Sequence, residues 1–202
     1  MKWLAPVLAY LAVGLGLFVF QSAWGALVGF HLAILVTLFS AKPGLSPLIL
    51  FQFKRLRWTV FSVLVCGSSG VTLYILWARF GFAPDLAQQV QALGLTRASW
   101  PPFILYFALV NPLVEEYFWR GWLGGETTAL HVSDFLYAGF HGLILFHKVA
   151  PVTILFALSM LVLAGWFWRQ LYRSERGLLA AVLGHCAADC TILLAVYGRL
   201  AG

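Results

Sequence analysis

The sequence is a succession of apolar runs, most of them close to the length that a lipid bilayer requires. Of its 202 residues, 62% are hydrophobic and only 10% are charged, and the mean hydropathy is +0.90. A soluble domain carries roughly 25% charged residues, whereas a membrane-spanning helix needs ~20 consecutive apolar ones. The sequence therefore predicts a polytopic membrane protein, with no polar segment long enough for a separate soluble domain.

The apolar runs predict an all-α helix bundle of about seven transmembrane spans. Basic, glycine-containing or proline-containing connections separate the runs from one another. The expected spans cover residues 3–20, 24–40, 58–77, 101–122, 133–146, 151–168 and 178–197. We expect residues 1–202 to form a single integral membrane domain.

The basic residues are interpreted as orientation signals for the membrane. The formal net charge of +6 would suggest a nucleic-acid partner in a soluble protein, but most of these residues lie near the ends of apolar runs. With the N-terminus in the cytoplasm, eight basic residues fall on the cytoplasmic side and four on the other, an asymmetry that favours this orientation. The two sets are Lys2, Lys42, Lys54, Arg55, Arg57, Arg169, Arg173 and Arg176, and Arg79, Arg97, Lys148 and Arg199. We therefore expect a multi-pass protein of the plasma (inner) membrane, with the lipid bilayer as a partner and no nucleic acid.

Two adjacent carboxylates, Glu115 and Glu116, lie inside the fourth expected span. Ionisable groups in such helices are rare and are a functional-site hypothesis by default. Arg120 lies four residues after Glu116, on the same helix face and in the favourable order for an ion pair. Glu115 points about 100° away from Glu116, given 3.6 residues per turn. We interpret Glu116 and Arg120 as a supporting pair and Glu115 as the group left for chemistry.

Two further polar clusters have the spacing of one helix face: Tyr137 with His141, and His185 with Asp189. At ~1.5 Å per residue, Glu115, His141 and His185 each lie about 10–12 Å from the cytoplasmic end of their expected span. A single histidine among these could instead be a core residue, and His31, which has no polar partner at helical spacing, is interpreted in that way. Two carboxylates, two histidines and an aspartate at one depth indicate hydrolytic chemistry.

In such a group, a carboxylate can act as general base and a histidine can help to hold the attacking water. A second histidine and a further hydrogen-bond donor can stabilise an oxyanion. No serine nucleophile motif and no His-Glu-x-x-His zinc motif is present, although two histidines and a glutamate could still bind zinc on ligand type alone.

The ordered set of motifs resembles the CPBP family of intramembrane proteases, the group of type II CAAX prenyl endopeptidases and bacteriocin-processing or Abi proteins. The motifs are Glu-Glu-x-x-x-Arg at 115–120, aromatic-x-x-x-His at 137–141 and His-x-x-x-Asp at 185–189. The resemblance implies a protease core over about residues 101–198. It further implies a metal-independent, glutamate-type endopeptidase without cofactors, whose substrate is a membrane-associated protein or peptide.

The resemblance also implies roles for individual residues. Glu115 would activate water with the help of His141, and His185 and Asp189 would stabilise the oxyanion. Glu116 and Arg120 would organise the site. Tyr137 stands where phenylalanine is usual, and Asp189 stands where several members have asparagine. An ionised aspartate cannot donate a hydrogen bond, so Asp189 is expected to act either as a neutral donor or as an ionised partner of His185.

Two other functions fit the same polar residues. In a proton-coupled transporter, Glu115, His141 and Asp189 would form a relay, but the inverted repeats typical of transporters are not seen in the sequence. In a non-enzymatic immunity or scaffold protein, the motifs would serve packing alone. A cleavage assay separates that second alternative from a protease.

Overall fold

The computed structural model describes residues 2–200, and no residue in that range belongs to a β-strand. The chain forms a bundle of antiparallel helices. Its elements are η1 (Lys2–Leu4), α1 (Ala5–Gly14), η2 (Leu15–Val19), α2 (Ala23–Ala41), η3 (Pro47–Phe51), α3 (Leu56–Ile75), η4 (Trp77–Arg79), α4 (Leu86–Ala92), α5 (Trp100–Glu115), η5 (Glu116–Trp122), α6 (Val132–Gly139), α7 (His141–Leu145), α8 (Pro151–Glu175) and α9 (Leu179–Leu200).

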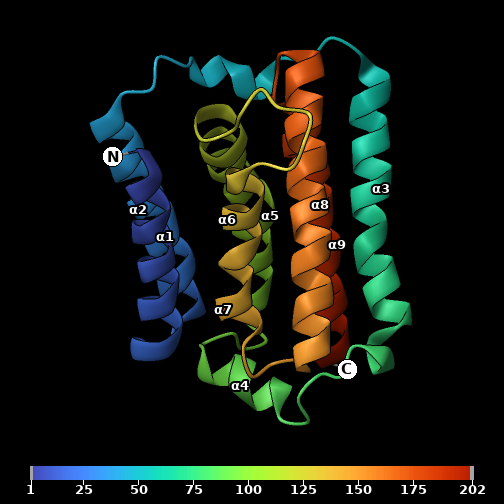
Figure 1. Ribbon diagram of the computed structural model, residues 1–202. Coiled ribbons are helices and arrows are strands. Elements are labelled where there is room, and N and C mark those ends of the chain that lie inside the picture. Colours follow the sequence, from blue (N-terminus) through green and yellow to red (C-terminus); the bar gives the residue numbers. More distant parts are fainter. Residues whose placement is uncertain (1, 201–202) are drawn as a thin grey trace.

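The long helices run in alternate directions and lie side by side (Figure 1). The α1–α2 hairpin forms one side of the bundle and α3 the opposite side, with α5, α6, α8 and α9 between them. The short segment η3 crosses one end of the bundle, and α4 covers the other end. The helices that carry the three polar motifs are therefore the central ones.

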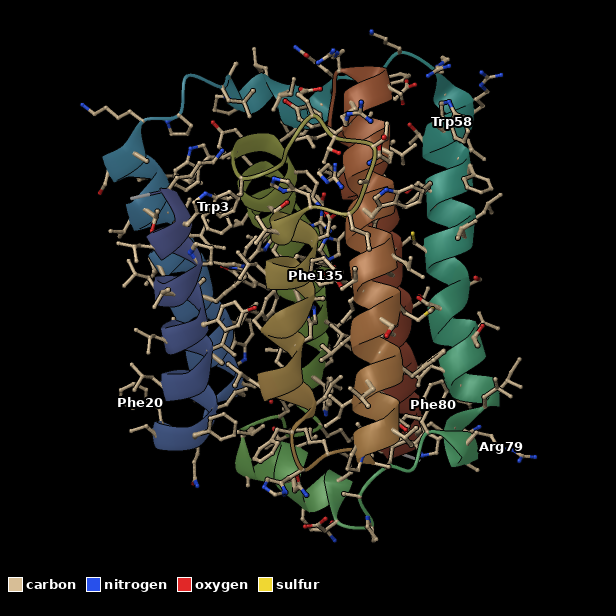
Figure 2. All side chains as sticks on the ribbon, in the orientation of Figure 1. Trp3, Phe20, Trp58, Arg79, Phe80 and Phe135 are labelled. Carbon is tan, nitrogen blue, oxygen red and sulfur yellow. The ribbon has the colours of Figure 1, made fainter. Side chains whose placement is uncertain are left out.

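Five helical segments in the described chain are long and apolar enough to cross a membrane, by length and composition. They are Lys2–Val19, Ala23–Ala41, Leu56–Ile75, Pro151–Glu175 and Leu179–Leu200. Large apolar side chains such as Leu64, Val152 and Leu155 are exposed on the outside, as expected for a surface in contact with lipid. Trp58 and Arg79 lie at opposite ends of the bundle, near the two ends of the α3 segment (Figure 2). The predicted polytopic helix bundle is confirmed.

The other two expected spans are shorter or interrupted. The fourth corresponds to the 16 residues of α5, continued by η5. The fifth, expected as one helix over residues 133–146, is broken at Phe140 into α6 and α7. A continuous α-helix would use the carbonyl oxygen of Leu136 to accept from the N–H of Phe140, but the hydroxyl of Tyr10 donates to that oxygen at 2.7 Å. The count of seven crossings stays a prediction.

A change of helix type begins at the motif itself. Residues Glu116–Trp122 form a π-helix, where the sequence predicts an ordinary α-helix. Leu123 correspondingly donates its N–H to the carbonyl of Phe118, five residues back. π-turns are rare and are frequently found at functional sites. The wider turn still leaves Glu116 and Arg120 close enough for an ion pair.

Close packing of α3 against α9 fixes the position of the third motif. A Cβ atom at Gly70 would collide with the backbone of Thr191, and one at Gly184 would collide with the hydroxyl of Ser62. Small residues at helix interfaces allow backbones to approach closely within a membrane. Gly184 directly precedes His185, so this contact helps to set the depth at which the histidine lies.

Candidate active site

The site forms where η5 meets α9. Nδ1 of His185 lies 2.8 Å from Oε1 of Glu116, and both side chains are buried. The same carboxylate oxygen lies 3.1 Å from Nη1 of Arg120. The first and third sequence motifs are therefore joined by direct contact, as their common predicted depth indicates.

Aromatic rings hold the guanidinium group of Arg120 from the side of α6 and α8. Its central carbon lies 3.8 Å from the centre of the Tyr137 ring and 5.0 Å from that of Trp168. A cation over an aromatic face is attracted by the negative face of the ring. A Cβ atom on Gly165 of α8 would lie 3.3 Å from Nη2 of Arg120, so the glycine leaves room for the arginine. Arg120 thus neutralises Glu116 and also packs as part of the core.

Glu115 has a different environment from its neighbour. Only 1% of its surface is exposed, and it forms no hydrogen bond or ion pair within the described chain, whereas Oε1 of Glu116 contacts both His185 and Arg120. The Oε2 atoms of both glutamates have no hydrogen-bond partner in that part of the chain. The ionisable groups around Glu115 are His185, Asp189, Arg120 and Glu116. The carboxylate is therefore held inside the polar cluster with an oxygen that no donor of the described chain satisfies.

His141 lies at the start of α7, immediately after the break in the α6–α7 segment. Its Nδ1 atom lies 3.1 Å from the backbone carbonyl of Tyr137. A carbonyl oxygen only accepts, so Nδ1 must carry the proton, and in a neutral ring Nε2 is then an acceptor. The ring also contacts that of Phe140, with centres 4.1 Å apart. His141 is half-buried, and the Tyr137 ring links it to His185, whose ring centre is 5.9 Å from that of Tyr137.

The second nitrogen of His185 faces Asp189. Nε2 lies 3.5 Å from Oδ2 of Asp189, one helical turn further along α9. The imidazole stacks on the Trp168 ring, with centres 4.7 Å apart. Oδ2 of Asp189 also accepts a hydrogen bond of 3.2 Å from Nδ2 of Asn111 on α5. Two helices thus meet at one carboxylate oxygen, and 14% of the aspartate side chain is exposed.

Three polar residues next to this cluster are not among the site residues that the sequence predicts, although His31 is buried, as its interpretation as a core residue requires. Asn111 is 2% exposed, and its Oδ1 atom lies 3.0 Å from Nε2 of His31. His31 in turn lies 3.1 Å from the hydroxyl of Tyr106. Asn111 precedes Glu115 by four residues, so helical spacing alone could have placed it on the same face. No spacing rule could have found His31, which lies 80 residues away on α2.

The environment of Arg169 differs from that expected from the sequence, where the residue is interpreted only as an orientation signal. It is 1% exposed and forms a 2.7 Å ion pair with Asp134. Its guanidinium group also donates to backbone carbonyls at Thr127 and Ala129. Arg169 therefore ties the connection between η5 and α6 to α8, close to the point where the site helix ends.

Between residues 2 and 200, no group of three or more His, Cys, Asp and Glu side chains has a geometry that could hold a metal ion. Glu116 is occupied by Arg120 and His185, and Asp189 by Asn111. The side chains that could ligate a metal are therefore in contact with one another, and Glu115 is the one without such a partner.

Comparison with known protein families gives a match over about half of the chain. The family model described as Type II CAAX prenyl endopeptidase Rce1-like matches residues 97–191. The matched range contains all three motifs and the elements from α5 to most of α9. No curated protein and no solved structure matches the chain.

Proposed function

Since residues 97–191 belong to the Rce1-like family of type II CAAX prenyl endopeptidases, within the CPBP proteases, we propose that the chain is an intramembrane endopeptidase that uses Glu115 to activate water. One observation carries the proposal. The 2.8 Å contact between Glu116 and His185 joins η5 to α9 and, with Arg120, engages Glu116, whereas the adjacent buried Glu115 has no bonded partner in the described chain. A general base must lie within hydrogen-bond reach of the water that it deprotonates.

In the proposed reaction, Glu115 accepts a proton from water while the water oxygen attacks the carbonyl carbon of the scissile peptide bond. The electron pair of the C=O double bond moves to the carbonyl oxygen and forms an oxyanion. When this intermediate collapses, the C–N bond breaks and the protonated Glu115 returns its proton to the leaving amine. The products are a new carboxylate and a new amine, and no metal ion or cofactor takes part.

The other site residues have supporting roles in this proposal. His141 offers Nε2 as an acceptor for the second hydrogen of the water, because its Nδ1–H is bonded to Tyr137. His185 and Asp189 stabilise the oxyanion by donating hydrogen bonds, which is worth most in a site shielded from water. Glu116 and Arg120 neutralise each other, and Glu116 joins η5 to α9 through His185.

We also propose that residues 1–202 act as one membrane domain, with the protease core at about 101–198. Contacts from the α1–α2 hairpin support this arrangement, since Tyr10 bonds α6 and His31 bonds α5. The excess of basic residues at one set of span ends supports a cytoplasmic N-terminus in the plasma (inner) membrane. The family supports a membrane-associated protein or peptide as the substrate, and prenylated peptides are the first class to test.

Cleavage by the full chain, purified and reconstituted in lipid vesicles, tests the proposal. The probes are an internally quenched farnesylated CAAX peptide and the same peptide presented on a transmembrane anchor without the prenyl group. We expect cleavage of at least one probe, at a single bond identified by mass spectrometry, and loss of that cleavage in Glu115→Gln. Absence of cleavage of both probes by the folded wild type would contradict the proposal and favour a transporter or scaffold.

A further inference from the structure

A histidine outside residues 97–191 is connected to the proposed site by hydrogen bonds through one other residue. His31 lies on α2, is 3% exposed, and its Nε2 atom lies 3.0 Å from Oδ1 of Asn111. We propose that His31, acting through Asn111, is a positioning residue that fixes the carboxyl group of Asp189. The inference deepens the proposed endopeptidase function and rests on it.

Hydrogen-bond chemistry gives this chain of contacts a direction. The amide oxygen Oδ1 of Asn111 can only accept, so Nε2 of His31 must be the donor. The amide nitrogen Nδ2 of Asn111 is then turned towards Oδ2 of Asp189, at 3.2 Å. If the amide group turned over, its oxygen would face a carboxylate oxygen, and two acceptors repel. His31 at Oδ1 and Asp189 at Nδ2 therefore fix the orientation of the Asn111 amide together, and loss of the His31 donor releases one end of it.

The ring of His31 is itself held at both nitrogens. Its Nδ1 atom lies 3.1 Å from the hydroxyl of Tyr106, six residues after the start of α5. In a neutral ring with the proton on Nε2, Nδ1 accepts from that hydroxyl. The ring centre also lies 5.6 Å from that of Tyr106. The Tyr106 hydroxyl can therefore pair with Nδ1 while Nε2 of His31 donates to Asn111.

The consequence falls on the two oxygens of Asp189. Oδ2 accepts from Asn111 and lies 3.5 Å from Nε2 of His185, so it is the oxygen engaged with the protein. Oδ1 makes no hydrogen bond within the described chain. A proton carried by a neutral Asp189 therefore belongs on Oδ1, where it can be donated to an oxyanion. The hydrogen bonds from His31 to Asn111 and from Asn111 to Oδ2 therefore keep the O–H group of Asp189 pointing away from Asn111 and His185.

A purely structural role would give a different result on mutation. Buried polar groups are normally hydrogen-bonded, so a variant that loses such a bond loses stability whatever its effect on catalysis. A positioning role requires in addition that turnover falls with the substrate affinity kept, and that the fall depends on Asp189. These two requirements can be measured.

The experiment compares His31→Phe, His31→Gln and Thr37→Val in the full chain, reconstituted in lipid vesicles with the probe that the wild type cleaves. Phenylalanine keeps the ring and removes the donor, whereas the amide nitrogen of glutamine can replace Nε2 as a donor. Thr37 is the matched control, because it lies on the same helix and its hydroxyl bonds only to the carbonyl of Ala33. We expect His31→Phe to lower kcat by about 10–10² at an unchanged KM, as a misplaced catalytic group does, and His31→Gln and Thr37→Val to stay near the wild type.

A double-mutant cycle ties the effect to Asp189. In an Asp189→Ala background, His31→Phe should cause no further loss of kcat, because the group that His31 positions is gone. Equal losses in both backgrounds, or a wild-type kcat in His31→Phe alone, would overturn the inference while leaving the proposed protease intact. Cleavage by Glu115→Gln at the wild-type rate would instead overturn the proposed function.

A second measurement does not depend on cleavage. In protein labelled with ¹⁵N-histidine, the Nε2 resonance of His185 reports on the Asp189 carboxyl group that it faces. We expect that resonance to shift in His31→Phe and to remain in place in Thr37→Val. An unshifted resonance in His31→Phe would show that Asp189 is not positioned from α2, and would overturn the inference even if no probe were cleaved.

Discussion

Nδ1 of His185 lies 2.8 Å from Oε1 of Glu116, although 69 residues separate them in the chain. The contact joins η5 to α9 inside the bundle, at an oxygen that Arg120 also approaches to 3.1 Å. It engages one of two adjacent glutamates at Oε1, while the other, Glu115, forms no hydrogen bond or ion pair within the described chain. The proposed mechanism therefore gives the two neighbouring carboxylates different roles, ion pairing for Glu116 and proton transfer for Glu115.

Arg120→Ala is expected to lower stability, because it leaves the buried Glu116 without its arginine counter-charge. Removing one member of a buried ion pair costs roughly 3–5 kcal/mol. The double variant Glu116→Gln, Arg120→Gln should recover part of this loss, since neither uncompensated charge remains. Thermal melting of the purified protein in detergent measures both effects.

The matched control for this prediction is Glu126→Gln. Glu126 pairs with Arg173 and Arg176, but 71% of its side chain is exposed. An exposed pair contributes about 0–1 kcal/mol, so this variant should melt close to the wild type. Equal melting temperatures for the Arg120 single variant and the double variant would contradict the buried-pair account.

Gly70→Ala is expected to weaken the packing of α3 on α9, because the added Cβ atom would collide with the backbone of Thr191. Overpacking of this kind costs typically 1–3 kcal/mol. Gly67→Ala on the same helix is the control, since its Cβ atom would meet only Ala187 at 3.5 Å, an ordinary contact. Thermal melting should therefore separate the two variants, and a Gly70→Ala protein as stable as Gly67→Ala would show that the interface can relax.

Asp189→Asn is expected to keep most of the activity. The asparagine oxygen can still accept from Asn111, while its amide nitrogen replaces the proposed O–H donor. Asp189→Ala removes the donor and should lower turnover by about 10²–10³, the usual effect of losing one oxyanion donor. Turnover of both variants, measured together, distinguishes a neutral donor from an ionised partner of His185: an Asn variant as inactive as the Ala variant means that the charge is required.

Prolonged treatment with a strong chelator is expected to leave cleavage unchanged, because the proposed mechanism uses a carboxylate and not a metal-bound water. Elemental analysis of the treated protein is the companion measurement. Stoichiometric zinc, with activity lost on its removal and restored on its return, would replace the proposed mechanism with that of a metalloprotease.

Much of the architecture follows from the sequence, because two kinds of regularity are visible in it. Apolar runs of sufficient length predict the long helices, and a spacing of four residues places Glu116 with Arg120 and His185 with Asp189. Both pairs lie in contact in the structure. The catalytic roles of these residues stay predictions.

Contacts between distant helices could not be predicted in the same way. Beside the break at Phe140, the carbonyl of Leu136 accepts from the hydroxyl of Tyr10, which lies 126 residues away in the chain. His31 has no polar neighbour on its own helix face and acquires one only when α2 packs against α5. Arg169 resembles an orientation charge at a helix end until the fold brings Asp134 to it. Each of these contacts is a property of the packed bundle and leaves no periodic trace in the sequence.

The central claim is that Glu115 is the general base, and the most direct test is the ratio of kcat for Glu115→Gln to that for wild type. Both proteins are reconstituted in the same lipid vesicles, with equal melting temperatures as the criterion of folding and Glu126→Gln as the control for loss of a carboxylate elsewhere. The account predicts that Glu115→Gln is about 10²–10⁴-fold slower, while Glu126→Gln cleaves at the wild-type rate. A folded Glu115→Gln protein that cleaves the probe at a near-normal rate would contradict it.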